Sequence, residues 1–198
     1  MLVRHRMTQN PVTMTPQDTL ATAQEKMTAG RFRHLPVVQD GTLSGILTDR
    51  DVRRHVGVQE RTRVVAAMTE SPLTVSPLAT VEEAVQLLLT HQIDGLPVLE
   101  DGKLVGILTT SNVMQALLDV MGASTEGNVR IDLMQGEEGT DLSEAAKLVS
   151  DLGGQVLGIG TYVDRWGPVF SFRLRGVDPQ TAAVALGDKG FTVLGVHQ

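Results

Sequence analysis

Apolar and polar positions in the first 122 residues follow one pattern twice. Each copy begins with a short extended segment, and a helix-period pattern follows it. The helix is clearest in the second copy, where Val81, Ala84 and Leu88 share one face. The matching helix of the first copy contains Leu20 and is expected to end at Gly30, a common C-terminal signal. The sequence therefore predicts one amphipathic helix near the start of each copy.

Two short apolar runs come next in each copy and predict a β-hairpin. In the first copy they are residues 35–38 and 43–47, and in the second they are residues 96–99 and 104–108. The turn between them contains Asp-Gly in both copies, and glycine tolerates the positive φ that tight hairpin turns require. A second helix is expected to start directly after each hairpin. Each copy is thus predicted to run strand, helix, strand, strand, helix.

The copies also agree letter by letter. Residues 7–52 align without a gap on residues 68–113, at a constant offset of 61 positions. The shared strings are Met-Thr-x-x-Pro-x-Thr, Leu-Pro-Val and Gly-Ile-Leu-Thr-x-x-Asp/Asn. A unit that recurs whole usually needs its twin to bury an apolar face. We expect the two copies to pack together.

The last shared string lies where a strand leads into a helix, with Thr48 and Asp51 in one copy and Thr109 and Asn112 in the other. Unsatisfied amides at a helix start can hold a phosphate. The threonine hydroxyl adds a donor, and the Asp or Asn side chain can accept hydrogen bonds from ribose hydroxyls. Thr-x-x-Asp is equally a helix capping box, which needs no ligand. Both interpretations remain open.

A different pattern begins after residues 122–127, which we interpret as a linker. It predicts a βαββαβ order, and its expected elements are a strand at 128–134, a loop at 136–139, a helix from Asp141, strands at 155–163 and 169–174, a helix from Pro179 and a strand at 191–196.

Composition narrows the classes of partner. The chain has 198 residues, 41% apolar residues, 3% aromatic residues and a formal net charge of -6. Nucleic-acid binding is disfavoured, because it depends on a basic excess and often on aromatic stacking. The absence of cysteine excludes disulfides and thiolate chemistry. No stretch approaches the roughly 18 apolar residues of a membrane span, and no signal peptide is recognised, so a cytoplasmic protein without membrane contact is expected.

Catalytic and metal motifs are missing from the sequence. The five histidines lack metal-ligand spacing, and no Gly-x-Ser-x-Gly, His-Glu-x-x-His or Walker string occurs. Asp49 and Asp51 could in principle hold Mg²⁺, but one helical turn does not easily aim both at a shared site. We predict no catalytic residue, no metal site and no required cofactor.

The paired copies resemble cystathionine-β-synthase (CBS) domains, with unit 1 at residues 1–61 and unit 2 at residues 62–124. This resemblance implies two pseudo-symmetric units packed sheet against sheet, with two clefts for adenine nucleotides or adenosyl compounds such as AMP, ADP, ATP or S-adenosylmethionine. The residues that it places in one cleft are Thr13, His34, Pro36, Thr48 and Asp51, and those in the other are Thr74, Gly95, Pro97, Thr109 and Asn112.

Charge differs between the copies. The basic residues Arg31, Arg33, His34 and Arg50 of the first copy correspond to Gln92, Asp94, Gly95 and Ser111 of the second. Arginines favour bound phosphates, so the cleft of the first copy, with Arg50 beside Asp51, is expected to take a polyphosphate. A solvated basic face is the alternative. Asn112 stands where CBS domains more usually have an acid.

Residues 128–198 resemble ACT domains, which are ferredoxin-like regulatory modules that often bind amino acids at dimer interfaces. ACT domains usually have Pro-Gly-x-Leu in this loop, whereas residues 138–142 lack the proline and have one extra residue. Two roles therefore stay open for this part, amino-acid binding and a purely dimerising or docking role.

The order of a CBS pair and an ACT-like tail resembles acetoin-utilisation B-type proteins. The expected fold is α/β, with two CBS units and a βαββαβ domain. The preferred function is a non-catalytic sensor that forms a homodimer and transmits ligand binding to the ACT-like domain or to a regulated enzyme or transporter. The alternatives are a dimerisation adaptor with vestigial clefts and a small-molecule enzyme.

Overall fold

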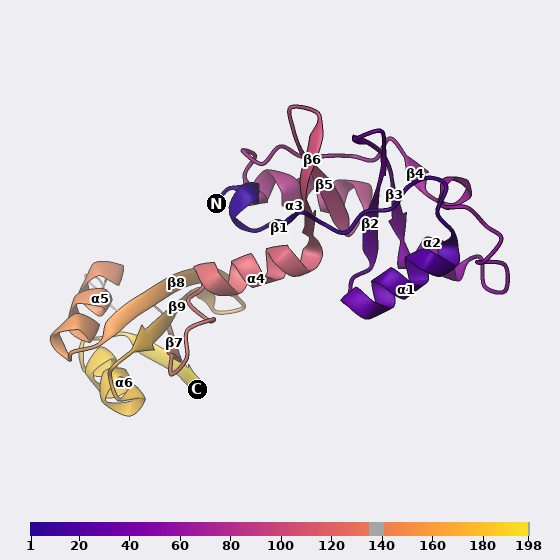
Figure 1. The fold of residues 1–198 in the computed structure, drawn as a ribbon. Coiled ribbons are helices and arrows are strands. Elements are labelled where there is room, and N and C mark those ends of the chain that lie inside the picture. The colour runs from indigo at the N-terminus through magenta and orange to yellow at the C-terminus, as the bar shows by residue number, and fades with distance from the viewer. Residues whose placement is uncertain (135–140, 198) are drawn as a thin grey trace. The chain divides into compact units, whose positions relative to one another are not determined.

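The computed structural model describes residues 1–134 and 141–197 and has a mixed α/β fold with three sheets (Figure 1). It divides into two compact units, residues 1–114 and 115–198. The elements of the first unit are the 3₁₀ turns Val3–His5 and Val64–Ala66, strands β1 Thr8–Gln9, β2 His34–Gln39, β3 Thr42–Thr48, β4 Thr69–Glu70, β5 Gly95–Glu100 and β6 Lys103–Thr109, helices α1 Leu20–Gly30, α2 Asp49–Arg53 and α3 Val81–His91, and the start of α4 Thr110–Val120.

The first strand of each copy joins the sheet of the other copy. β1 pairs with β6 of the second copy, and β4 pairs with β3 of the first, which gives sheets β1-β6-β5 and β2-β3-β4. Gly45 of β3 permits this approach, because a Cβ there would lie 2.6 Å from the sulfur of Met68. The short extended segment predicted at the start of each copy makes a single bridge to its own copy, such as Met14 with Val37.

The crossing segments also complete the cores. Val64, which precedes β4, is fully buried in the cluster of the first copy with Leu35 and Leu47. Val3, which precedes β1, is buried in the cluster of the second copy with Leu96. The two sheets meet where β3 lies against β6. The predicted sheet-against-sheet pair is confirmed, and its halves are interlocked.

Both hairpins form as predicted. Asp40 and Gly41 have φ of 51° and 79°, and the equivalent turn of the second copy has nearly the same angles. The first helix ends at Gly30, as predicted, and the left-handed residue that follows it is Arg31, with φ of 54°. Its equivalent Gln92 has φ of 53°.

The second unit contains an antiparallel sheet of order β10-β7-β9-β8, and the two helices α5 and α6 pack against it (Figure 1). The predicted βαββαβ order is confirmed. The loop predicted at 136–139 lies outside the described residues, and the resemblance to ACT domains stays a prediction. The elements are β7 Val129–Met134, α5 Leu142–Asp151, β8 Gln155–Asp164, β9 Gly167–Arg175, α6 Pro179–Asp188 and β10 Thr192–His197.

Candidate functional site

Two clefts open at the two strand-to-helix junctions of the first unit. We call them the Asp51 cleft, with a volume of about 460 Å³, and the Asn112 cleft, with a volume of about 360 Å³. The lining residues of the Asn112 cleft are Thr8, Asn10, Pro11, Val12, Arg31, Phe32, Arg33, His34, Ile107, Thr109, Ser111 and Asn112. Their equivalents 61 positions away, all of which line the Asp51 cleft, are Thr69, Ser71, Pro72, Leu73, Gln92, Ile93, Asp94, Gly95, Ile46, Thr48, Arg50 and Asp51. The clefts are therefore symmetry-related versions of one site.

Each cleft is built from both copies. The Asp51 cleft takes its junction from the first copy, while Pro72, Leu73 and Gly95 come from the second. The cause is the crossing of the first strands, since β4 lies beside β3 and carries the segment that follows it to this cleft. The grouping expected from the sequence, in which each cleft belonged to one copy, is corrected here.

Four of the candidate residues lie elsewhere. Of the described residues that line the two clefts, none is Thr13, Pro36, Thr74 or Pro97. The two prolines are buried in β2 and β5, where their carbonyls accept hydrogen bonds from Met14 and from the equivalent Val75. The other candidates, Thr48, Arg50, Asp51, His34, Gly95, Thr109 and Asn112, do line a cleft.

Sequence reasoning missed two cleft residues, Asn10 and Ser71, that lie three positions before Thr13 and Thr74. Asn10 and Ser71 line the clefts with φ of 46° and 47°, a left-handed conformation that is uncommon outside glycine. The Asn-Pro and Ser-Pro pairs are turn signals that mark these positions. They do not indicate which of the two sheets the turn faces.

The junction of the first copy is a complete capping box. The Thr48 amide donates to Asp51 Oδ2 at 3.0 Å, and the Thr48 hydroxyl donates to the same oxygen at 2.5 Å. The Asp51 amide donates back to Thr48 Oγ1 at 3.4 Å. The capping interpretation is thus confirmed as geometry. It leaves Asp51 Oδ1 with a single contact among the described residues, to Arg54 at 3.5 Å, so this oxygen can still accept from a ligand hydroxyl.

The junction of the second copy has the same backbone arrangement but leaves a different polar group available to a ligand. Asn112 Oδ1 accepts from the Thr109 amide at 2.8 Å and from the Thr109 hydroxyl at 2.7 Å. These two bonds use the lone pairs of that oxygen, and the remaining polar group of Asn112 is an NH₂ donor. Asp51 therefore offers an acceptor to its cleft, whereas Asn112 offers a donor.

His34 lies where the two clefts adjoin and lines both of them. Its ring packs against Gly95, where a Cβ would lie 3.0 Å from His34 Cδ2. Burial lowers the pKa of His34 below its usual value; nearby Arg33 lowers it further, and Asp94 opposes the shift. The imidazole is therefore predominantly neutral at pH 7, and it packs against Gly95.

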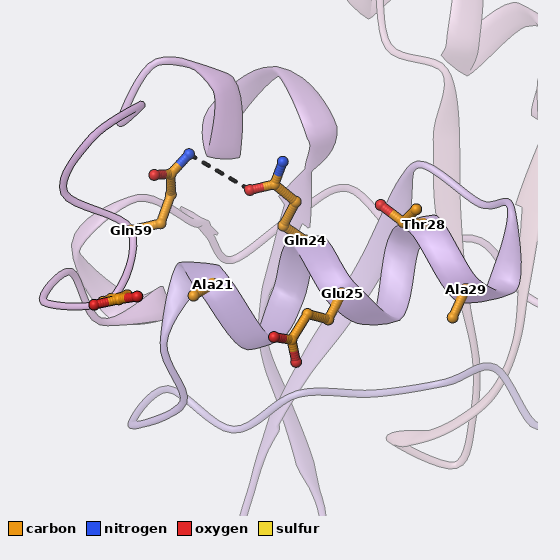
Figure 2. A pocket seen from close by; sticks show the side chains of 7 residues that line it. Ala21, Gln24, Glu25, Thr28, Ala29 and Gln59 are labelled. Carbon is orange, nitrogen blue, oxygen red and sulfur yellow. Dashed lines mark hydrogen bonds between the residues drawn. The ribbon is translucent and has the colours of Figure 1, made fainter.

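A larger groove, with a volume of about 550 Å³, runs along the outer face of α1 and lacks the junction residues. Figure 2 shows Gln24, Glu25 and Thr28 along the helix, with Gln59 reaching Gln24 by an Nε2–Oε1 hydrogen bond of 3.5 Å. Small side chains, Ala21 and Ala29, form much of the rest. The charged residues that line the groove, Glu25 and Glu60, are both acidic, and none of its described lining residues is basic, so the groove is a weaker candidate for a phosphate-bearing ligand than the two clefts.

Among residues 1–134 and 141–197, no cluster of three or more His, Cys, Asp or Glu side chains could hold a metal ion. Within those ranges no helix is long and apolar enough to cross a membrane.

Comparison with known families and proteins agrees with this architecture. The family model of the CBS domain matches residues 3–57 and 63–119. The chain is similar to the CBS domain-containing protein YhcV of Bacillus subtilis, with 33% identity over 114 residues, which make up 56% of this chain and 81% of YhcV.

Solved structures give the same result. CBSX2, a CBS-pair protein of Arabidopsis thaliana solved in complex with AMP, is 33% identical with a TM-score of 0.53, and the match covers 59% of this chain and 96% of that one. A Vibrio cholerae protein provisionally assigned as the acetoin utilization protein AcuB is 30% identical with a TM-score of 0.55, and the match covers 60% of this chain and 90% of that one.

Proposed function

Because this chain belongs to the CBS domain family, we propose that it is a non-catalytic regulatory protein whose two clefts bind an adenine nucleotide or a related adenosyl ligand. AMP, ADP, ATP and S-adenosylmethionine are the ligands of choice. The carrying observation is the pair of equivalent clefts, each with a capped threonine junction on one wall and a proline-containing turn from the other copy.

The chemistry of the lining supports an adenosyl ligand. In the Asp51 cleft, Oδ1 of Asp51 is placed to accept from ribose hydroxyls, while Leu73 and Ile93 supply apolar surface for a base. In the Asn112 cleft, Val12 and Phe32 supply the equivalent apolar surface. The solved complex of CBSX2 with AMP also supports an adenine nucleotide as the ligand.

Ligand binding would be transmitted through a two-fold homodimer to a regulated enzyme or transporter, or to the second unit, which could take an amino acid or serve for docking. Homodimers with two-fold symmetry are the commonest closed assembly. Light scattering at tens of micromolar protein tests this part of the proposal, and a monomer at that concentration would count against it.

A thermal-shift screen tests ligand binding. A ligand present at about 100 times its Kd stabilises the folded protein by about 2.7 kcal/mol. For a chain of this size, the expected rise in melting temperature is about 5 to 10 °C. Absence of a shift with every adenosyl ligand at millimolar concentration would favour an adaptor with vestigial clefts, and turnover of a ligand would favour an enzyme.

A further inference from the structure

Charged side chains are divided unequally between the two equivalent clefts. Arg31 and Arg33 line the Asn112 cleft, and none of the described residues that line it carries a carboxylate. Arg33 also lines the Asp51 cleft, whereas Arg31 does not. The equivalent positions in the Asp51 cleft hold the uncharged Gln92 and the acidic Asp94. At the junction itself, Asp51 replaces the neutral Asn112. One cleft is therefore basic, whereas the other combines both signs of charge.

The ion pairs formed by the arginines also differ between the two clefts. Arg31 and Arg33 form no ion pair with any residue in the ranges that the structure describes. In the Asp51 cleft, Arg53 is held by Asp49 at 2.9 Å, and Arg54 lies 3.5 Å from Asp51. Arg31 and Arg33 are thus available for a ligand. In the Asp51 cleft Arg53 and Arg54 are already paired, whereas Arg50 forms no ion pair with a described residue. The carboxylates of Asp49, Asp51 and Asp94 line that same cleft and offset its arginines.

We propose that the Asn112 cleft is the polyphosphate site and that the Asp51 cleft takes adenosyl ligands with little negative charge. This inference rests on the proposed function. It reverses the expectation from the sequence, which assigned the polyphosphate to the cleft of the first copy. The reversal follows from the crossing of the copies, because Arg31 comes from the first copy but lines the cleft at the junction of the second and not the Asp51 cleft.

The two junctions fit this division. Each added phosphate brings negative charge that unpaired guanidinium groups bind by strong, charge-assisted hydrogen bonds. The free Oδ1 of Asp51 suits ribose hydroxyls but repels phosphate, and Asp94 adds to that repulsion. S-adenosylmethionine, which carries a sulfonium group, is attracted by the same carboxylates. Affinity at the Asn112 cleft should therefore rise with phosphate number, and affinity at the Asp51 cleft should not.

Exchanging one equivalent pair of residues tests the proposal without strain. Arg31 and Gln92 are both exposed and have φ of 54° and 53°, so each position already accepts the backbone conformation that the other residue adopts. The variants are Arg31→Gln, Gln92→Arg and the double exchange. Calorimetric titration with adenosine, AMP, ADP and ATP measures the affinities, and thermal melting checks that each variant is folded.

In Arg31→Gln, we expect the affinity for ATP to fall about three- to tenfold, because an exposed charge-assisted contact is lost. The affinity for adenosine should change less than about twofold, because an uncharged ligand has no phosphate for the guanidinium to bind. Gln92→Arg should strengthen ATP binding at the Asp51 cleft, and the double exchange should restore part of the lost ATP affinity.

The outcomes separate this inference from the function beneath it. If adenosine or AMP binds but Arg31→Gln leaves the ATP affinity unchanged, or lowers adenosine and ATP affinity equally, the charge division is wrong and the proposed function stands. If no adenosyl ligand binds to the unmodified protein, the proposed function fails and this inference fails with it.

Discussion

The two copies of the repeat have kept one set of features and changed another. Leu35 and Leu96 are both fully buried at equivalent positions, and both junctions keep the same threonine hydrogen bonds. The charges that face the clefts have diverged instead. Packing and capping are needed for each half to fold, whereas cleft charge affects only what binds. The comparison therefore separates residues constrained by stability from residues free to set specificity.

The largest expected effect concerns the shared core. Leu35→Ala and Leu96→Ala should each lower the free energy of unfolding by about 2 to 5 kcal/mol, because each leaves a cavity among buried side chains. Denaturant unfolding of the full chain measures both. The two losses should be similar, and a difference of more than about 2 kcal/mol would show that the equivalent cores are not energetically equivalent.

The junction side chains should separate the copies. Asp51→Ala should weaken adenosine binding about tenfold to a few hundredfold, since charge-assisted bonds to ribose hydroxyls are lost. Asn112→Ala should have a smaller effect, because its carboxamide oxygen is already occupied by Thr109. Calorimetric titration with adenosine, which has no phosphate for the Asp51 carboxylate to repel, measures both.

The control for this pair is stability. Each substitution removes a capping interaction and should cost about 1 kcal/mol of folding free energy in either copy. If both variants lose the same stability and neither loses affinity, Asp51 serves only to cap the helix. If the Kd is unchanged in Asp51→Ala but the affinity falls strongly in Asn112→Ala, then Asn112 and not Asp51 binds the ribose hydroxyls.

The smallest expected effect concerns pH and His34. Its pKa is lowered by burial in the folded protein, so the unfolded chain binds the proton more readily. The stability associated with the neutral ring is present above the unfolded pKa of about 6.5 and is lost as pH falls below it. His34→Gln should therefore reduce the drop in melting temperature between pH 7.5 and pH 5.5.

A matched control is His91→Gln, which changes an exposed histidine at the end of α3. This variant should keep the pH response of the unmodified protein. If His34→Gln behaves in the same way as His91→Gln, the buried imidazole does not contribute to the acid sensitivity of the fold.

The sequence was sufficient to predict the repeat, both hairpins, the junctions and the element order of the second unit, because these depend on local spacing. It was not sufficient to predict the crossing. β1 contains only Thr8 and Gln9, too short for any apolar alternation, and its two candidate partners carry the same Gly-Ile-Leu-Thr letters. A repeat makes pairing within and between copies locally indistinguishable, so the cleft membership of Arg31 could not be assigned.

The crossed first strands change what counts as the smallest independent part of this protein. A single copy cut from the chain would keep its own hairpin but lose the strand and the buried valine that the other copy lends it. Two such fragments could recover both only by exchanging those segments with each other. In this protein both copies lie on one chain, so the exchange that would join two separate molecules takes place within a single molecule.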